Sequence, residues 1–183
     1  MSSIDTQPSN KNLLSAFGFK FSIKKTPNVN WFIQSATIPS ISLTKTQVAS
    51  PFVAFPVGGD HLIFDDLQIT FRVDEDLANY KEIYNWMIGI GFPDNFDQFK
   101  NLAQKVPGKY NTGNSGFVEG TNIYSDASLI ILSSSMNPIF EINFIDLFPI
   151  SLSELKFDSQ LTSVQYLEAT TTFTYRSFTI NNF

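Results

Sequence analysis

The clearest hydrophobic pattern in the chain is a strict alternation of apolar and polar residues over positions 66–73. Its apolar members are Leu67, Ile69, Phe71 and Val73. Successive side chains of a β-strand point to opposite faces, so this period of two is typical of a strand with one buried face. The pattern predicts a half-buried strand here.

A helical pattern follows immediately. Residues 74–76 are three consecutive acids, and apolar residues then recur at helical spacing over 77–90. Acidic side chains suit a helix N-terminus, where they accept hydrogen bonds from free backbone N–H groups. Their negative charge is also attracted to the positive end of the helix dipole. Gly89 and Gly91 are expected to end the helix, and Pro93 to prevent its continuation.

The N-terminal part of the chain predicts a hairpin. Residues 17–23 alternate between apolar and polar, Pro27 and Asn28 favour a turn, and residues 31–38 form a second strand pattern. Pro39 is expected to end that strand.

The next segment is less regular. Residues 41–48 are rich in Thr and Ser and alternate only weakly, which fits either a third strand or an extended arm. Pro51, Pro56, Gly58 and Gly59 then predict a loop that leads into the alternating strand.

After the helix, residues 92–104 fit a short second helix, and residues 105–120, rich in Gly and Asn, predict a long surface loop. Strands are expected at 124–133 and 139–148, with Pro149 breaking the second.

Residues 164–180 give the longest strand pattern. The face expected to meet the core carries Leu167, Ala169, Thr171, Phe173 and Tyr175. A run of β-branched residues that is polar on one side favours a strand with one wet face and one core face.

Together these patterns amount to about seven strands and one amphipathic helix. They predict a mainly β fold with two packed antiparallel sheets, a β-sandwich or partial barrel, and one flanking α-helix. Residues 1–12 are expected to form a flexible polar arm, and residues 13–183 a single β domain with a loop insertion at about 103–121.

Composition narrows the function classes. A chain of 183 residues with 43% hydrophobic and 16% charged residues is long and apolar enough for a core, and its 19 Phe favour sheets. A net charge of −5 argues against duplex-DNA binding, which needs clustered Lys and Arg. The chain has no Cys, which excludes disulfides and thiolate metal sites. Lacking a signal-like N-terminus and a run of roughly 18 apolar residues, it is expected to be made and kept in the cytoplasm, or assembled there.

Candidate chemistry is sparse. The single His, His61, lies near Asp60, Asp65 and Asp66, but no Ser sits in a nucleophile elbow, so a surface-loop role is the better interpretation. The glycine pairs lack the Lys-Ser/Thr of a phosphate loop. No catalytic, metal or cofactor residue is assigned, and the chain is expected not to be an enzyme.

Carboxylates offer two further candidate clusters. Asp74, Glu75 and Asp76 resemble paired acid–base carboxylates but are far more often a helix start. Asp94 and Asp97 lack the glycine and distal Glu of a calcium loop, so turn chemistry explains them better.

Two stretches resemble the tail tube proteins of contractile-tailed bacteriophages. The first runs from the Phe-Asp-Asp-Leu of 64–67 through Val-Asp-Glu-Asp at 73–76 to Tyr-Asn-Trp at 84–86. The second combines Asp-Leu-Phe-Pro at 146–149 with Leu-Ser-Glu-Leu at 152–155, before the long last strand. A weaker match is the Gln-Ser-Ala that begins at Gln34.

The resemblance implies hexameric rings of the chain that stack into a hollow tube, with an inner β-barrel made of strands from all six copies and DNA passing through it unbound. It implies sheath, tape measure and baseplate proteins as partners, no cofactor, and a place in the virion. Ring closure would also remove exposed sheet edges, which are a liability in a monomer.

On this hypothesis the polar faces of the two long strands line the lumen. The lumen candidates are Asp66, Gln68, Thr70, Arg72, Glu168, Thr170, Thr172, Thr174 and Arg176. The segment 41–56, with Phe52 and Phe55, is the candidate arm that contacts a neighbouring subunit or ring.

Several alternatives stay open. A baseplate tube initiator and a tail terminator ring share the implied fold, and a secretion-system tube protein is a further relative. From another class, a small hydrolase using His61 with an Asp is the remaining candidate.

Overall fold

The computed structural model describes residues 12–104, 123–160 and 164–183. The strands are β1 (Phe19–Ile23), β2 (Ile33–Ala36), β3 (Ile41–Val48), β4 (Phe55–Phe64), β5 (Leu67–Arg72), β6 (Ser125–Leu132), β7 (Pro138–Leu152), β8 (Glu168–Thr174) and β9 (Ser177–Asn182). The helices are α1 (Pro27–Trp31), α2 (Ala78–Gly91) and α3 (Phe96–Gln104). Most of the predicted 103–121 insertion and of the 1–12 arm lies outside the described residues, and residues 103 and 104 end α3.

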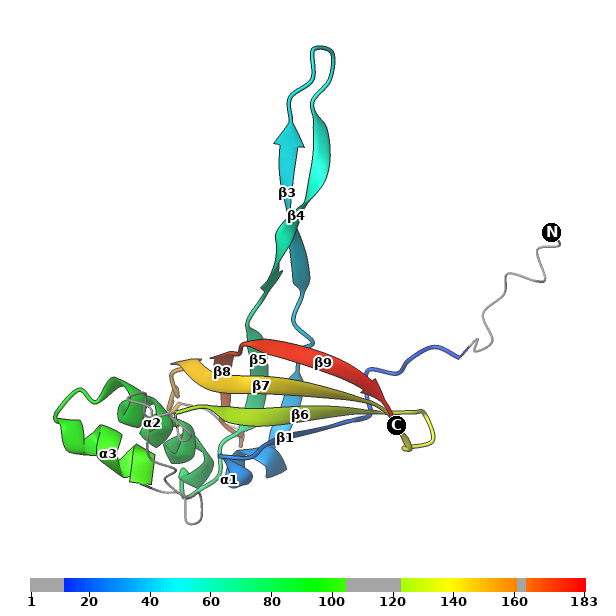
Figure 1. The fold of residues 1–183 in the computed structure, drawn as a ribbon. Helices are drawn as coiled ribbons and strands as arrows, with labels where there is room; N and C mark the ends of the chain where they lie inside the picture. Colours follow the sequence, from blue (N-terminus) through cyan, green and yellow to red (C-terminus); the bar gives the residue numbers. More distant parts are fainter. Residues whose placement is uncertain (1–11, 105–122, 161–163) are drawn as a thin grey trace.

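Seven strands form the body, and two form a separate hairpin (Figure 1). The body strands run in the order β1-β6-β7-β8-β5-β2, with β9 also beside β7, and every pairing is antiparallel. The long β7 pairs with β6 and β9 along its first part and with β8 near its end. The prediction of a mainly β fold with two antiparallel sheets joined as a sandwich or partial barrel is confirmed.

The core lies between the inner faces of the two halves of the body. Phe21, Phe71, Phe144 and Phe173 come from β1, β5, β7 and β8, and each is at most 3% exposed. Trp86 on α2 closes one end, with its ring centroid 6.1 Å from that of Phe173. Its indole N–H donates to the Ile123 carbonyl at 2.7 Å, which satisfies the buried donor.

The predicted strand at 66–73 and helix at 77–90 are confirmed as β5 and α2. The helix does not stop at Gly89, however, because that residue is buried inside α2 where α3 packs against it. A Cβ at Gly89 would lie 2.9 Å from the Leu102 Cβ, so the glycine permits close helix contact. The helix ends at Gly91, as predicted, and Phe92 caps it with a positive φ of 32°.

The predicted N-terminal hairpin is wrong. β1 pairs with β6 and β2 pairs with β5, and α1 separates them. Pro27 opens α1 because its fixed φ suits the first turn of a helix. Asn30 accepts from the Ile23 N–H at 2.8 Å and donates to the Ile23 carbonyl at 3.0 Å, so its side chain satisfies the end of β1 in place of a strand partner.

At two prolines the structure also differs from the prediction. The predicted loop around Pro56 is largely β4, a strand in a two-stranded hairpin, where a residue without an N–H is tolerated at an outer edge. β7 continues through Pro149, and the pairing register shifts between Pro149 and Ser151. A proline at such an irregularity removes little from the ladder.

The long C-terminal strand pattern becomes two strands. β8 and β9 run along the same edge of β7 with a break at Tyr175 and Arg176. The predicted core face is buried from Ala169 to Tyr175, but residues 164–167 lie outside the strand.

Candidate functional site

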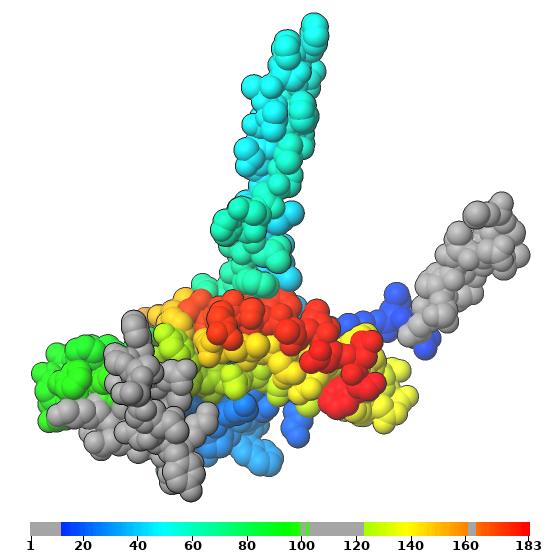
Figure 2. Space-filling model, in the orientation of Figure 1, coloured from blue at the N-terminus to red at the C-terminus, as the bar shows by residue number. Residues whose placement is uncertain are grey.

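The most prominent surface feature is the β3–β4 hairpin, which projects far from the body (Figures 1 and 2). Its strands pair from Ile41 opposite Phe64 to Val48 opposite Phe55. The extended arm expected over 41–56 and the third strand expected at 41–48 are therefore the same object, with β4 as an unexpected second half.

The hairpin is unusually apolar for a solvent-exposed element. Between 43% and 95% of each of nine large apolar residues is exposed, namely Ile41, Leu43, Val48, Phe52, Val53, Phe55, Val57, Leu62 and Ile63. Phe52, at the tip, is 95% exposed, and Phe55 is 51% exposed. An isolated two-stranded hairpin is at best marginally stable in water, so such a surface indicates an interaction site.

The base of the hairpin is firmly attached to the body. The Tyr175 hydroxyl donates to the Asp65 carbonyl at 2.8 Å, and the Asp65 N–H donates to the Ser40 carbonyl at 3.1 Å. The Phe64 ring meets those of Tyr175 and Phe178 edge-on at 6.2 and 5.5 Å. The arm is therefore anchored in the aromatic core where it leaves the body.

Burial shifts the acidity of the anchoring phenol. Desolvation, with smaller contributions from the Asp66 and Asp65 carboxylates, raises the pKa of Tyr175 to about 12. Tyr175 is 9% exposed, and its neutral hydroxyl keeps the hydrogen bond to the Asp65 carbonyl over the whole physiological range.

Most lumen candidates come together on one face of the body. In the β5–β8 pairing, Gln68 is opposite Thr172, Thr70 opposite Thr170 and Arg72 opposite Glu168. Thr174 extends the row on β8, and these seven residues are called the β5–β8 polar face below. The alternate residues of both strands, such as Ile69 and Thr171, are buried.

Contacts across this face are polar and mostly between small side chains. The Thr70 and Thr170 hydroxyls are 3.2 Å apart, and the Arg72 Nε is 3.7 Å from a Glu168 carboxylate oxygen. The other two candidates lie at its margin. Asp66 is exposed just before β5, and Arg176 sits in the break between β8 and β9, paired with Asp146 at 3.1 Å.

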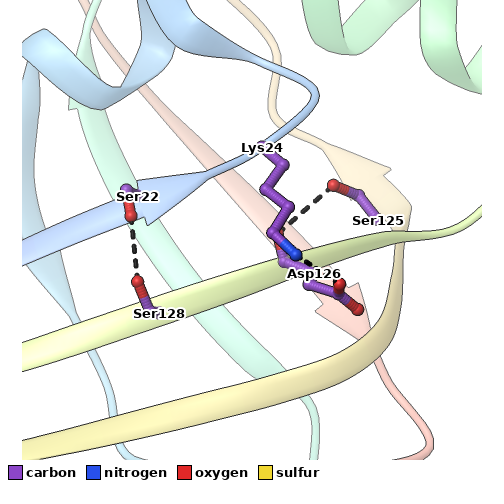
Figure 3. A network of polar contacts seen from close by, with 5 residues as sticks. All are labelled: Ser22, Lys24, Ser125, Asp126 and Ser128. Carbon is purple, nitrogen blue, oxygen red and sulfur yellow. Dashed lines mark hydrogen bonds and ion pairs between the residues drawn. The ribbon is translucent and has the colours of Figure 1, made fainter. Parts of the chain in front are cut away.

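Three strands leave an edge at the border of the body. β1 and β2 end the main strand order, and β9 pairs with β7 alone among the described strands. Polar contacts fix β1 against β6 (Figure 3): the Ser22 and Ser128 hydroxyls are 3.0 Å apart, and Lys24 forms a 2.7 Å ion pair with Asp126. Ser125 also donates to the Asp126 carbonyl at 3.3 Å. These contacts hold β1 against β6, and the other edge of β1 has no strand partner among the described residues.

A groove of about 470 Å³ lies between β1, α1 and β2. Its lining includes Phe19, Phe21, Trp31, Ile33 and Gln34, and Trp31 is 86% exposed. An exposed Trp beside a concave surface is typical of an interface anchor. No sequence pattern singled out Trp31, which was interpreted as the start of a strand.

A carboxylate holds α1 against α2. The Glu82 side chain accepts from the Asn28 N–H at 3.1 Å and from the Asn28 amide at 2.8 Å. Desolvation raises the pKa of Glu82, and the hydrogen bonds from Asn28 and Val29 oppose that shift. Glu82 thus fixes the helix that carries Trp31.

The structure brings one pair of the catalytic candidates together, at the protein surface. His61 lies on the exposed hairpin, where its Nδ1 contacts the neighbouring Asp60 carboxylate. Ser40 is not part of this pair, because its hydroxyl donates to the Asp65 carboxylate at the base of the hairpin. The acidic residues 74–76 begin the turn before α2, and buried Asn79 organises it by accepting from the Tyr80 N–H at 2.7 Å and donating to the Arg72 carbonyl at 2.7 Å.

Among the described residues, no three or more His, Cys, Asp or Glu side chains gather in a way that could hold a metal ion. None of the helices in this part of the chain is long and apolar enough to cross a membrane.

Comparison with known proteins finds one family model and several solved structures that match most of the chain. The model of a family described as phage tail tube protein matches residues 4–181. No curated protein sequence matches the chain.

Solved structures share the fold at low identity. The anti-feeding prophage cap, a tube-terminating cap, is 15% identical with a TM-score of 0.59, covering 100% of this chain and 99% of that chain. A sheath–tube complex of an extracellular contractile injection system is 14% identical with a TM-score of 0.52, covering 100% and 99%. The sheath/tube terminator of the same kind of system is 16% identical with a TM-score of 0.52, covering 93% and 98%.

Proposed function

Because this chain belongs to the phage tail tube protein family, we propose that it is a tube subunit that forms hexameric rings, which stack into a hollow tube for DNA passage. The observation that carries this proposal is the β3–β4 hairpin, which projects from the body (Figure 2) and has exposed apolar residues from Ile41 to Ile63. A folded monomer gains nothing from such an arm, whereas a polymer buries it between copies.

Unpaired edges support the ring. β1 and β9 each have one side without a partner among the described strands, and β2 ends the other half of the body. Addition of a neighbour's strand at such an edge satisfies its backbone N–H and C=O groups, and closure of six copies removes all free edges. The inner wall of the tube is then a continuous β-barrel.

The β5–β8 polar face is proposed to line the channel. It is dominated by Thr and Gln, and its Arg72 and Glu168 lie close enough to offset one another's charge. Binding of DNA requires phosphate neutralisation by clustered cations, so a surface of this kind lets DNA slide without being held. The chain's net charge of −5 acts in the same direction.

The proposed role is structural and not enzymatic. The assembled tube would sit in a virion tail or a related contractile particle, after assembly in the host cytoplasm. Sheath, tape measure and baseplate proteins are its proposed partners. The solved sheath–tube complex, which shares the fold, supports the sheath as one of them.

A terminator ring is the second candidate, because a tube-terminating cap shares this fold over 100% of the chain. A baseplate tube initiator and a secretion-system tube protein are the remaining candidates. The number of rings that stack separates these roles, since an initiator or terminator forms single rings.

Electron microscopy of the purified protein tests the proposal. Long tubes with six-fold cross-sections are expected, single rings would favour the terminator or initiator, and monomers would contradict every tube-related role. In the matched control, an Asn-Gly turn replaces residues 46–57 and joins Lys45 to Gly58, which are paired in the hairpin. This shortened protein is expected to fold and to remain unassembled.

A further inference from the structure

We propose that the groove between β1, α1 and β2 is the acceptor for the hairpin tip of a second copy of this chain. The occupant is the uncharged tip segment 49–54, with Phe52 and Val53 entering beside Trp31. The inference rests on the proposed tube function and adds the site on this chain that receives the arm.

The tip cannot reach the groove of its own chain. The ten residues of β4 span about 34 Å when extended, and the hairpin points away from the body. In Figure 1, α1 lies on the side of the body opposite the hairpin. The Tyr175 and Phe64 contacts hold the base of the hairpin, so folding back would break the aromatic anchor. The tip therefore meets another molecule.

The tip offers a large apolar surface to a neighbour. Phe52 and Val53, the tip residues that enter the groove, are 95% and 71% exposed, so covering them removes apolar area from water. Phe52 is the most exposed of the nine apolar residues of the hairpin. An aromatic residue at the end of a stiff arm is a typical anchor for a neighbour's pocket.

The groove fits this occupant in size and chemistry. Its volume of about 470 Å³ lies within the range of pockets that bury most of a small ligand. Phe19, Trp31 and Ile33 give it apolar walls, and Gln34 supplies a polar group at its border. Lys20 is the one charged residue in the described lining of the groove, so a tip without charged side chains meets little electrostatic opposition there.

The placement of the two surfaces determines the kind of assembly. Tip and groove lie on opposite sides of the molecule, so the contact is head-to-tail. A head-to-tail contact that does not close repeats without limit, which is the symmetry of a stack of rings. The hairpin direction would then be the direction of stacking.

A rival acceptor is the aromatic cluster of Phe92, Phe96 and Phe99 around α3. Its rings already pack against one another, with centroids 5.6 to 5.9 Å apart. Among the described residues, no comparable cluster of packed rings occupies the groove. The groove is therefore the better acceptor.

The absence of Cys in the chain permits a clean crosslinking test. One full-length protein carries Ser50→Cys at the tip, which keeps Phe52, and a second carries Gln34→Cys in the groove, which keeps Trp31. The two are mixed, assembled and mildly oxidised. A disulfide-linked dimer is expected, and adding Phe52→Ser to the tip protein should reduce its yield at least fivefold. The control partner carries Asn95→Cys, beside the Phe96 cluster.

Each outcome decides the inference. Crosslinking to position 34 but not to 95 supports it. Crosslinking to 95 alone, tip-to-tip dimers of Ser50→Cys, or stacked rings without any crosslink would overturn it while leaving the tube function in place. Mixtures that stay monomeric in electron micrographs would remove both the acceptor and the tube function.

Discussion

The Arg176 guanidinium lies 3.1 Å from the Asp146 carboxylate, at the point where the partner of β7 changes from β9 to β8. Asp146 has a positive φ of 56° within β7, and Arg176 occupies the break between β8 and β9. The Arg176 N–H also donates to the Ile145 carbonyl at 3.0 Å. One ion pair therefore joins neighbouring strands at this change of partner.

Substitution at this point separates backbone strain from charge. Asp tolerates the left-handed region better than a β-branched residue, so Asp146→Val is expected to lower the free energy of unfolding by about 1–2 kcal/mol. Arg176→Ala removes only a half-exposed ion pair and should cost ~0.2–1 kcal/mol. Urea unfolding measures both. Equal losses for the two variants would contradict a backbone contribution.

The packing of α2 on α3 is tested with two neighbouring glycines. Gly89→Ala places a Cβ 2.9 Å from the Leu102 Cβ and is expected to destabilise the protein by about 1–3 kcal/mol through overpacking. Gly91→Ala meets nothing within 4 Å and should be neutral or stabilise by up to about 1 kcal/mol. Thermal unfolding of the two variants provides the comparison, and a stable Gly89→Ala protein would show that the helices separate freely.

Alkaline pH weakens the anchor of the hairpin. The folded pKa of Tyr175, about 12, lies above its ordinary value of 10.0, so the folded state binds this proton more tightly. The stabilisation is fully present below pH 10 and is lost as the pH rises through 12. Tyr175→Phe removes this pH dependence together with the hydrogen bond to the Asp65 carbonyl. Near neutral pH it is expected to lower the free energy of unfolding by about 1 kcal/mol.

Unfolding measured from pH 9 to 12 checks this expectation. The stability difference between the natural protein and Tyr175→Phe should narrow as the pH rises, because only the natural protein loses the Tyr175 contribution. Tyr84→Phe, at a half-exposed tyrosine on α2, is the matched control. A constant difference across the range would contradict the assignment.

The arm is expected to matter for assembly and not for folding. Phe52→Ser removes a 95% exposed ring, so the unfolding temperature should change by less than about 2 °C while tube formation falls at least tenfold. Phe157→Ser, at a 74% exposed ring outside the hairpin, controls for a general loss of surface apolarity. Normal tubes from Phe52→Ser, seen by electron microscopy, would contradict the role of the tip.

The lumen assignment predicts a charge effect. Gln68→Lys combined with Thr172→Lys places two cations at one paired position of the β5–β8 polar face. If this face lines the channel, ejection of DNA through assembled particles should slow, and more strongly at low salt than at high salt.

Ser135→Lys, in the exposed turn between β6 and β7, is the single-site control, and it should leave ejection unchanged. A normal ejection rate for the doubly substituted tube, with its six-fold ring intact, would place the β5–β8 polar face outside the channel.

The sequence by itself determined the elements whose signals are local. The alternation at 66–73 and the 3.6-residue period after it gave β5 and α2, because the spacing of apolar residues follows directly from the geometry of each element. The alternation of apolar and polar residues also marked the buried face of β8. The matched motifs pointed to the correct family.

Only the tertiary structure decided which strands pair and what the hairpin is. Alternation states which face of a strand is buried but not which strand lies beside it, so β1 and β2 were wrongly joined. Gly59 illustrates the same limit. It predicted a loop, yet it lies in β4 beside the register shift of the hairpin. A Cβ at this position would lie 2.6 Å from the Thr44 carbonyl oxygen. Partners and close approaches of this kind depend on residues distant in the chain, which no local pattern contains.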